Sequence, residues 1–121
     1  MKQISGNVFS TGADLVKSLR WIGIASAAVN KLDYAASGGN HSPEGIVKAI
    51  LAGASAVEIC SAFYQNSYAL VAEYTRFLNL WMDRKGMETI SQFKGMLNVS
   101  DLNGVNTFER TQFMKYFSSR K

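Results

Sequence analysis

Residues 32–62 have the sequence LDYAASGGNHSPEGIVKAILAGASAVEICSA. Two apolar runs of strand length, 32–36 and 54–60, enclose a segment in which apolar residues recur every three to four positions. A strand–helix–strand order of this kind is typical of a βαβ unit, in which the two strands are parallel. This stretch therefore predicts an α/β fold.

The helix inside this stretch has clear start and stop signals. Ser42 is placed to cap its N-terminus, Pro43 suits the first helical position, and Glu44 puts a negative charge in the first turn. Gly53 is placed to form the C-terminal cap. We therefore expect a helix that begins at Pro43 and ends before Gly53.

Helical patterns also lie on both sides of the βαβ stretch. Before it, residues 13–30 have apolar residues at helical spacing, and after it a long amphipathic helix is predicted over 67–85, with Gly86 as its stop. Residues 89–96 and 107–117 predict two shorter helices. The predicted packing stripe of the long helix consists of Leu70, Val71, Tyr74, Leu78, Trp81 and Met82.

The composition limits the function classes. A chain of 121 residues has room for one domain, and its single cysteine and single histidine exclude an internal disulfide, a cysteine-based zinc site and a multi-histidine metal centre. With 13 Lys+Arg against 9 Asp+Glu, the net charge of +4 is below what a nucleic-acid-binding protein usually carries. No apolar run approaches the length of a membrane span, and residues 1–7 lack the apolar core of a signal peptide. We therefore expect a cytoplasmic protein that binds neither nucleic acid nor membrane.

The ends of the two predicted strands carry the best candidate site. Ser37, Gly38 and Gly39 follow the first strand, and Cys60-Ser61-Ala62 ends the second. Small residues let the backbone approach a ligand closely, and free N–H groups at such turns favour a phosphate. The alternative is that the glycine pair is only a tight turn and the second segment only the start of a helix.

Other residues with chemical potential have weaker signals. His41 could contact a ligand near the glycines, although a solvated loop position is the commoner case. Cys60 is expected to be a small buried core residue rather than a nucleophile, because no cationic neighbour in sequence would activate it. Asp33 and Glu58 fall within the predicted strands, as interior polar residues or as edge charges.

The sequence around these loops resembles a known family. Residues 34–44 and 51–62 are similar to the C-terminal part of the dihydroorotate dehydrogenase family, and so is the pattern of tryptophan, glycine and phenylalanine over 81–95. Residues 19–22 and 108–115 resemble its dihydroorotate dehydrogenase-like branch. The resemblance extends over nearly the whole chain, from about Ser10 to Tyr116.

The resemblance implies a flavoprotein oxidoreductase of pyrimidine biosynthesis. Members of this family fold as a (β/α)8 TIM barrel that binds FMN, and they oxidise dihydroorotate to orotate while the flavin takes the hydride. The two predicted strands would be strands seven and eight. By position, the residues implied to contact the FMN phosphate are Gly38, Gly39, Ser61 and Ala62, flanked by Ser37 and Cys60.

The resemblance also implies that the chain is one part of a barrel. The family's catalytic base and flavin-ring lysine lie on earlier strands, so we expect residues 1–121 to form a partial domain of about two parallel strands with flanking helices, helix-rich when isolated, with a helical tail from about 87. Such a chain should be inactive alone and should self-associate as a homo-oligomer, while the parent protein binds FMN and a small-molecule substrate.

Two other classes of function remain open from the sequence. A small helical protein-interaction module without enzymatic activity would use the apolar helix faces to bind a partner. A nucleic-acid binder would use the aromatic and basic residues of the tail, over 108–117. Packing of that tail against the rest of the protein is the commoner explanation for its composition.

Overall fold

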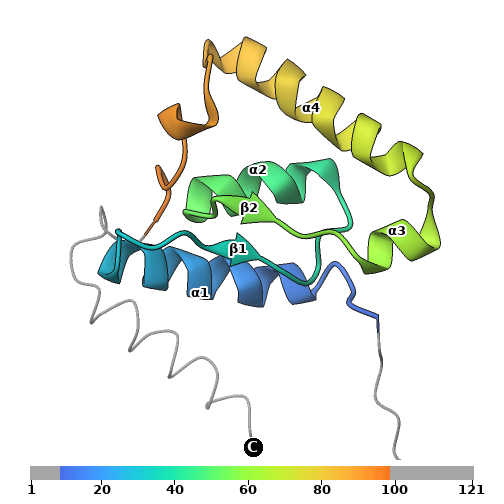
Figure 1. The fold of residues 1–121 in the computed structure, drawn as a ribbon, viewed down its shortest axis with the longest axis horizontal. Coiled ribbons are helices and arrows are strands. Elements are labelled where there is room, and N and C mark those ends of the chain that lie inside the picture. Colours follow the sequence, from blue (N-terminus) through green and yellow to red (C-terminus); the bar gives the residue numbers. More distant parts are fainter. Residues whose placement is uncertain (1–8, 99–121) are drawn as a thin grey trace, which may run out of the picture.

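The computed structural model describes residues 9–98, which form a helix-rich α/β arrangement around two parallel strands (Figure 1). The elements in chain order are α1 (Asp14–Ala28), β1 (Ala35–Ala36), α2 (Pro43–Ala52), β2 (Ala56–Val57), α3 (Ser61–Gln65), α4 (Ala69–Lys85) and a 3-10 turn, η1 (Ile90–Gln92). The predicted helix over 107–117 and the aromatic and basic tail lie outside the described residues.

The predicted βαβ unit is confirmed, with α2 as the crossover between β1 and β2. Ala35 pairs with Ala56 and Ala36 with Val57, in parallel. Each strand is shorter than the apolar run that predicted it, because within the described chain each has a partner on one side only. Ala35 and Ala56 are exposed, so one face of this small sheet is uncovered, although parallel sheets are normally covered on both.

The ends of α2 match the sequence signals. Ser42 has an extended backbone, and its hydroxyl accepts a hydrogen bond from the Gly45 amide at 3.2 Å. At the other end Gly53 has a φ of 124°, and a Cβ there would lie 2.2 Å from the Ser26 hydroxyl oxygen of α1. Gly53 therefore ends α2 and also permits its close packing against α1.

Helix α2 contributes residues to two apolar clusters, one on each of two sides. On the side of α1, small residues of α2 pack against the strands and α1, and the buried Ser26 hydroxyl donates to the Ala52 carbonyl at 3.0 Å. This cluster consists of Ile22, Ala36, Ala49, Ala52 and Ala54. In Figure 1, α1 and α4 lie on opposite sides of α2.

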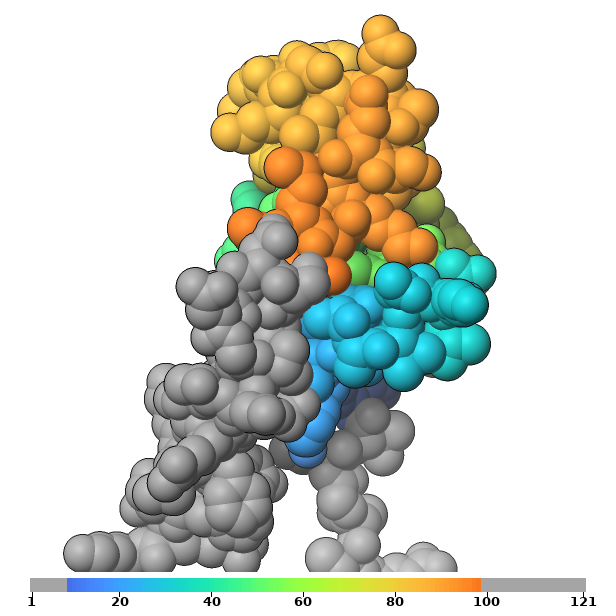
Figure 2. Space-filling model, turned by 90° about the vertical axis from the view of Figure 1, so that its left-hand side faces the viewer, coloured from blue at the N-terminus to red at the C-terminus, as the bar shows by residue number. Residues whose placement is uncertain are grey.

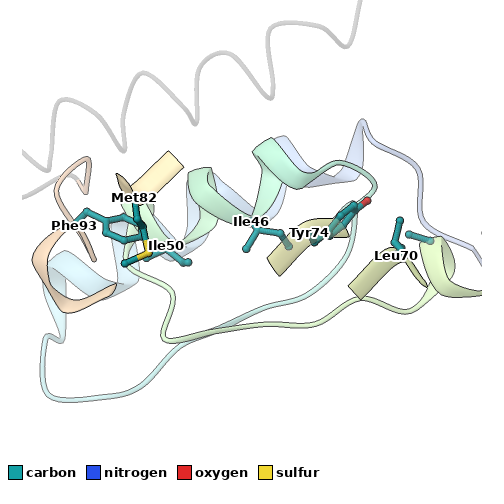
Figure 3. Close-up of a cluster of buried hydrophobic side chains, with 7 residues drawn as sticks. Ile46, Ile50, Leu70, Tyr74, Met82 and Phe93 are labelled. Carbon is teal, nitrogen blue, oxygen red and sulfur yellow. The ribbon is translucent and has the colours of Figure 1, made fainter. Parts of the chain in front are cut away.

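A second cluster joins α2 to α4 and to the segment that follows (Figure 3). Its buried residues are Ile46, Ile50, Ala62, Leu70, Tyr74, Met82 and Phe93. Burial raises the pKa of the Tyr74 phenol, and the carboxylates of Glu73 and Glu44 add to the shift. The predicted stripe of α4 is correct for Leu70, Tyr74 and Met82, but wrong for Val71, which is exposed.

The segment after α4 differs from the prediction. Gly86 ends α4 in the left-handed conformation, as expected, but the helix predicted over 89–96 is only the three-residue turn η1. Beyond it the Gly95 amide donates to the Ile50 carbonyl and the Leu97 amide to the Leu51 carbonyl, both at 2.9 Å. These bonds attach the segment to carbonyls in the last turn of α2, where the Ile50 carbonyl also accepts from the Gly53 amide at 2.9 Å. Figure 2 shows this segment, in orange, beside the residues that follow α1.

Candidate functional site

A pocket lies where β1 and β2 end, in the part of the fold where parallel α/β proteins bind their ligands. Its volume is about 190 Å³, enough for roughly six water-sized groups. Three segments form it: one residue before α1, the loop after β1, and the residues from the end of β2 into α3. The lining residues are Ser10, Ser37, Gly38, Gly39, Asn40, His41, Glu58, Cys60, Ser61 and Ala62.

The loop after β1 needs both of its glycines, for different reasons. Gly38 and Gly39 have φ angles of 87° and 81°, which residues with a side chain rarely adopt. A Cβ on Gly38 would have its nearest neighbour at 3.8 Å, the Ser18 hydroxyl, whereas a Cβ on Gly39 would lie 2.1 Å from the Leu15 backbone nitrogen. Gly39 is therefore required by the close approach of α1, and Gly38 only by the turn.

Asn40 joins the two loops beneath the pocket. Its side chain is buried, with 3% of the residue exposed, and its Nδ2 donates to the carbonyls of Ala36 at 3.4 Å and Glu58 at 2.9 Å. These two acceptors determine the orientation of the amide, since a flipped side chain would place oxygen against oxygen. The remaining atom, Oδ1, is buried without a hydrogen-bond partner among residues 9–98.

Ser10 bridges the two loops from the N-terminal side. Its backbone N–H donates to the Ser61 hydroxyl at 3.0 Å, and its own hydroxyl oxygen accepts from the Gly39 amide at 3.1 Å. The same oxygen lies 3.2 Å from Nε2 of His41. Ser10 thus contacts a residue of each loop that the sequence singled out.

The four residues implied to contact a phosphate and the two that flank them come together in this one pocket. They are Ser37, Gly38, Gly39, Cys60, Ser61 and Ala62. The prediction that Cys60 is a buried core residue is wrong, because its side chain is exposed at the start of α3. His41, expected in a solvated loop, is half-buried against Ser10.

The two strand carboxylates, left open by the sequence, are in different places. Glu58 follows β2 and lines the pocket with an exposed side chain. Asp33 precedes β1 at the opposite end, where its carboxylate accepts from the Ser55 hydroxyl at 2.9 Å and lies 3.6 Å from Lys94 Nζ. Only Glu58 can therefore act on a ligand in the pocket.

Sequence reasoning missed Ser10 and Asn40. Ser10 is 51 residues from its partner Ser61, so no local spacing connects them. Asn40 follows the glycine pair directly, and that position was the one available signal, because asparagine often bonds to backbone groups in turns.

The chemistry of the pocket suits a small anion held by neutral donors. Its lining contains backbone amides and hydroxyls but no Lys or Arg, and Glu58 is its only carboxylate.

Among the described residues, no group of His, Cys, Asp and Glu could hold a metal ion. Within residues 9–98, none of the helices is long and apolar enough to cross a membrane.

Comparison with models of protein families and with curated proteins found no match to this chain.

Proposed function

We propose that this pocket binds the phosphate group of FMN, in the C-terminal part of a dihydroorotate dehydrogenase-like oxidoreductase. The observation that carries the proposal is the convergence of Gly38, Gly39, Ser61 and Ala62, flanked by Ser37 and Cys60, on one cavity. The two loops are about twenty residues apart in sequence, and the parallel pairing of β1 with β2 brings both to one edge of the sheet. There their small residues line the same cavity.

The size and polarity of the pocket support a phosphate ester. A volume of about 190 Å³ accommodates the five heavy atoms of a phosphate but is below the range of about 300–1,000 Å³ for pockets that enclose whole drug-sized ligands. The flavin ring would therefore lie outside it. Glu58 is an acceptor, and the hydroxyls of the ribityl chain next to the phosphate are suitable donors for it.

The uncovered faces support the proposal that β1 and β2 are strands seven and eight of a (β/α)8 barrel. Ala35 and Ala56 point away from the helices, as residues of a barrel interior would, and both outer strand edges lack a partner within the described chain. When bound, FMN would supply the hydride-accepting chemistry. The chain's own residues would hold the phosphate, and the isolated chain would be inactive in the oxidation of dihydroorotate to orotate.

In this proposal the parent protein is a cytoplasmic enzyme of pyrimidine biosynthesis with a small-molecule substrate. Two large apolar side chains on or next to α1, Trp21 and Leu32, are each 60% exposed. Such surfaces favour association, so we expect the 121-residue chain to form homo-oligomers. Sedimentation velocity tests this, and a monomer that persists at high protein concentration would contradict it.

A comparison of FMN with riboflavin tests the phosphate site directly. The two differ only in the phosphate, so the 121-residue chain should quench or polarise FMN fluorescence and bind riboflavin at least tenfold more weakly, which is about 1.4 kcal/mol. Inorganic phosphate should compete with FMN. Equal binding of the two flavins, or binding of neither, would refute the proposed function.

A further inference from the structure

The hydroxyl of Ser10 has a weakly engaged donor at the pocket. Its oxygen has two acceptor sites, and two donors can fill them: the Gly39 amide at 3.1 Å and, when it carries a proton, His41 Nε2 at 3.2 Å. The hydroxyl proton must then point elsewhere. Among residues 9–98 its other partner is the Ser61 hydroxyl oxygen, to which it donates at 3.4 Å, a long distance for a bond between two hydroxyls.

Ser61 is itself engaged by the same residue. The Ser10 backbone N–H donates to the Ser61 hydroxyl oxygen at 3.0 Å, so one of the acceptor sites of Ser61 is already filled. The Ser10 hydroxyl proton therefore has only a weak partner within the described residues, although Ser10 lines the cavity. A better acceptor placed in the cavity would draw that proton toward itself.

We propose that Ser10 is a direct ligand of the bound phosphate and that His41 positions its hydroxyl for this role. The inference rests on the proposed phosphate site and adds a third segment to it, outside the two loops. The Gly39 amide donates to Ser10, and Ser10 donates to a phosphate oxygen, so that the amide acts on the ligand through the serine. A chain of this kind strengthens each of its bonds by polarisation.

The proton on His41 decides where the Ser10 proton can point. An imidazole that carries a proton on Nε2 donates to Ser10 and leaves the Ser10 proton for the ligand, whereas an unprotonated Nε2 accepts that proton and withdraws it from the ligand. His41 therefore assists the proposed role of Ser10 when Nε2 is the donor.

Other polar and charged groups lie close to His41. Glu58 and Cys60 line the same pocket, Asp14 accepts from the Thr11 amide at 2.7 Å next to Ser10, and Glu44 is in the first turn of α2. The variant His41→Asn keeps a polar side chain and leaves these groups unchanged. A change in anion affinity in this variant therefore reports on His41.

The test measures anion affinity in the 121-residue chain by calorimetry or by competition with FMN. Sulfate is the anion probe beside FMN, because it is a dianion of fixed charge. Ser10→Ala should weaken sulfate and FMN about tenfold, Ser10→Thr should restore most of the loss, and the surface substitution Ser91→Ala should change nothing. His41→Asn should weaken sulfate binding, and wild-type sulfate affinity in that variant would overturn the positioning role of His41.

The outcomes separate this inference from the proposed function. If the wild-type chain binds neither sulfate nor FMN, both are overturned. If it binds them and Ser10→Ala binds equally well or more tightly, Ser10 is not a ligand but occupies the ligand's place, and only the inference fails. Circular dichroism of each variant shows whether it is folded, and if Ser10→Ala is unfolded, failure of the folded Ser10→Thr to bind would overturn the inference.

Discussion

The two ends of the strand pair differ in how their polar groups are paired. At the end where the strands begin, Asp33, Ser55 and Lys94 bond to one another: the serine donates to the carboxylate at 2.9 Å, and the lysine contacts both. At the end where the strands finish, the loops enclose a cavity of about 190 Å³ and the Oδ1 atom of Asn40 is left without a partner.

This difference separates an end that stabilises the chain from an end with room for a ligand. At the first, three side chains bond to one another, and Lys94 connects the segment after α4 to the loops before β1 and β2. At the second, polar residues line a cavity that a small ligand could occupy. In β/α barrels the same division is general, with ligands at the carboxyl ends of the strands and stabilising contacts at the other.

The largest loss of stability should come from a substitution at Gly39, in the loop after β1 that lines the pocket. Gly39→Ala would place a Cβ 2.1 Å from the Leu15 backbone nitrogen at a φ of 81°, so the loop or α1 must move, at a cost of about 3 kcal/mol or more in the free energy of unfolding. Urea denaturation measures it. Gly38→Ala is the matched control, because it has the same unfavourable φ but open space, and should cost only about 1–2 kcal/mol. Equal losses would show that α1 does not restrict this loop.

Asn40→Ala should weaken both the fold and the pocket. It leaves the Glu58 carbonyl without its donor and removes the connection between the loops, which predicts a loss of about 2 kcal/mol in unfolding free energy together with weaker FMN binding. Asn79→Ala, at an exposed position of α4, should have no such effect. An Asn40→Ala protein of wild-type stability would mean that the asparagine does not hold the two loops together.

The fold was more predictable than the site, for physical reasons. Helix α2 was predicted to the residue, because Ser42, Pro43 and Gly53 are local signals that act within one turn. The turn η1 was not predicted, because the hydrogen bonds from Gly95 and Leu97 to the end of α2 depend on tertiary packing. Local propensity cannot anticipate a carbonyl forty residues away.

The same distinction applies to the pocket. Its two loops could be found because small residues after a strand form a local pattern, and parallel strands bring such loops to one edge. Ser10 could not be found, because its bonds to Gly39 and Ser61 span 29 and 51 residues. Glu58 and Cys60 continue the alternation that begins with the exposed Ala56, while Val57 and Ile59 between them are half-buried.

Glu58→Gln would test the electrostatics at the functional end. The carboxylate lines the pocket and is exposed, so it opposes an anion through a partly screened repulsion. Removing the charge should strengthen inorganic phosphate binding by about two- to fivefold, and the gain should shrink at high salt. Glu88→Gln, after α4, is the control and should leave the affinity unchanged. Weaker phosphate binding in Glu58→Gln would show that the carboxylate helps to hold the ligand.

The smallest loss of stability should come from the end of the strand pair that lies opposite the pocket. Lys94→Met removes the cation from the cluster with Asp33 and Ser55, but Asp33 is 90% exposed, so the expected loss in unfolding free energy is below about 1 kcal/mol. Lys48→Met, on an exposed position of α2, controls for the loss of one positive charge. Because the cluster is at the far end of the strands from the pocket, neither variant should alter FMN affinity. A clear fall in FMN affinity for Lys94→Met alone would mean that the two ends are coupled, and that the cluster contributes to the site as well as to the fold.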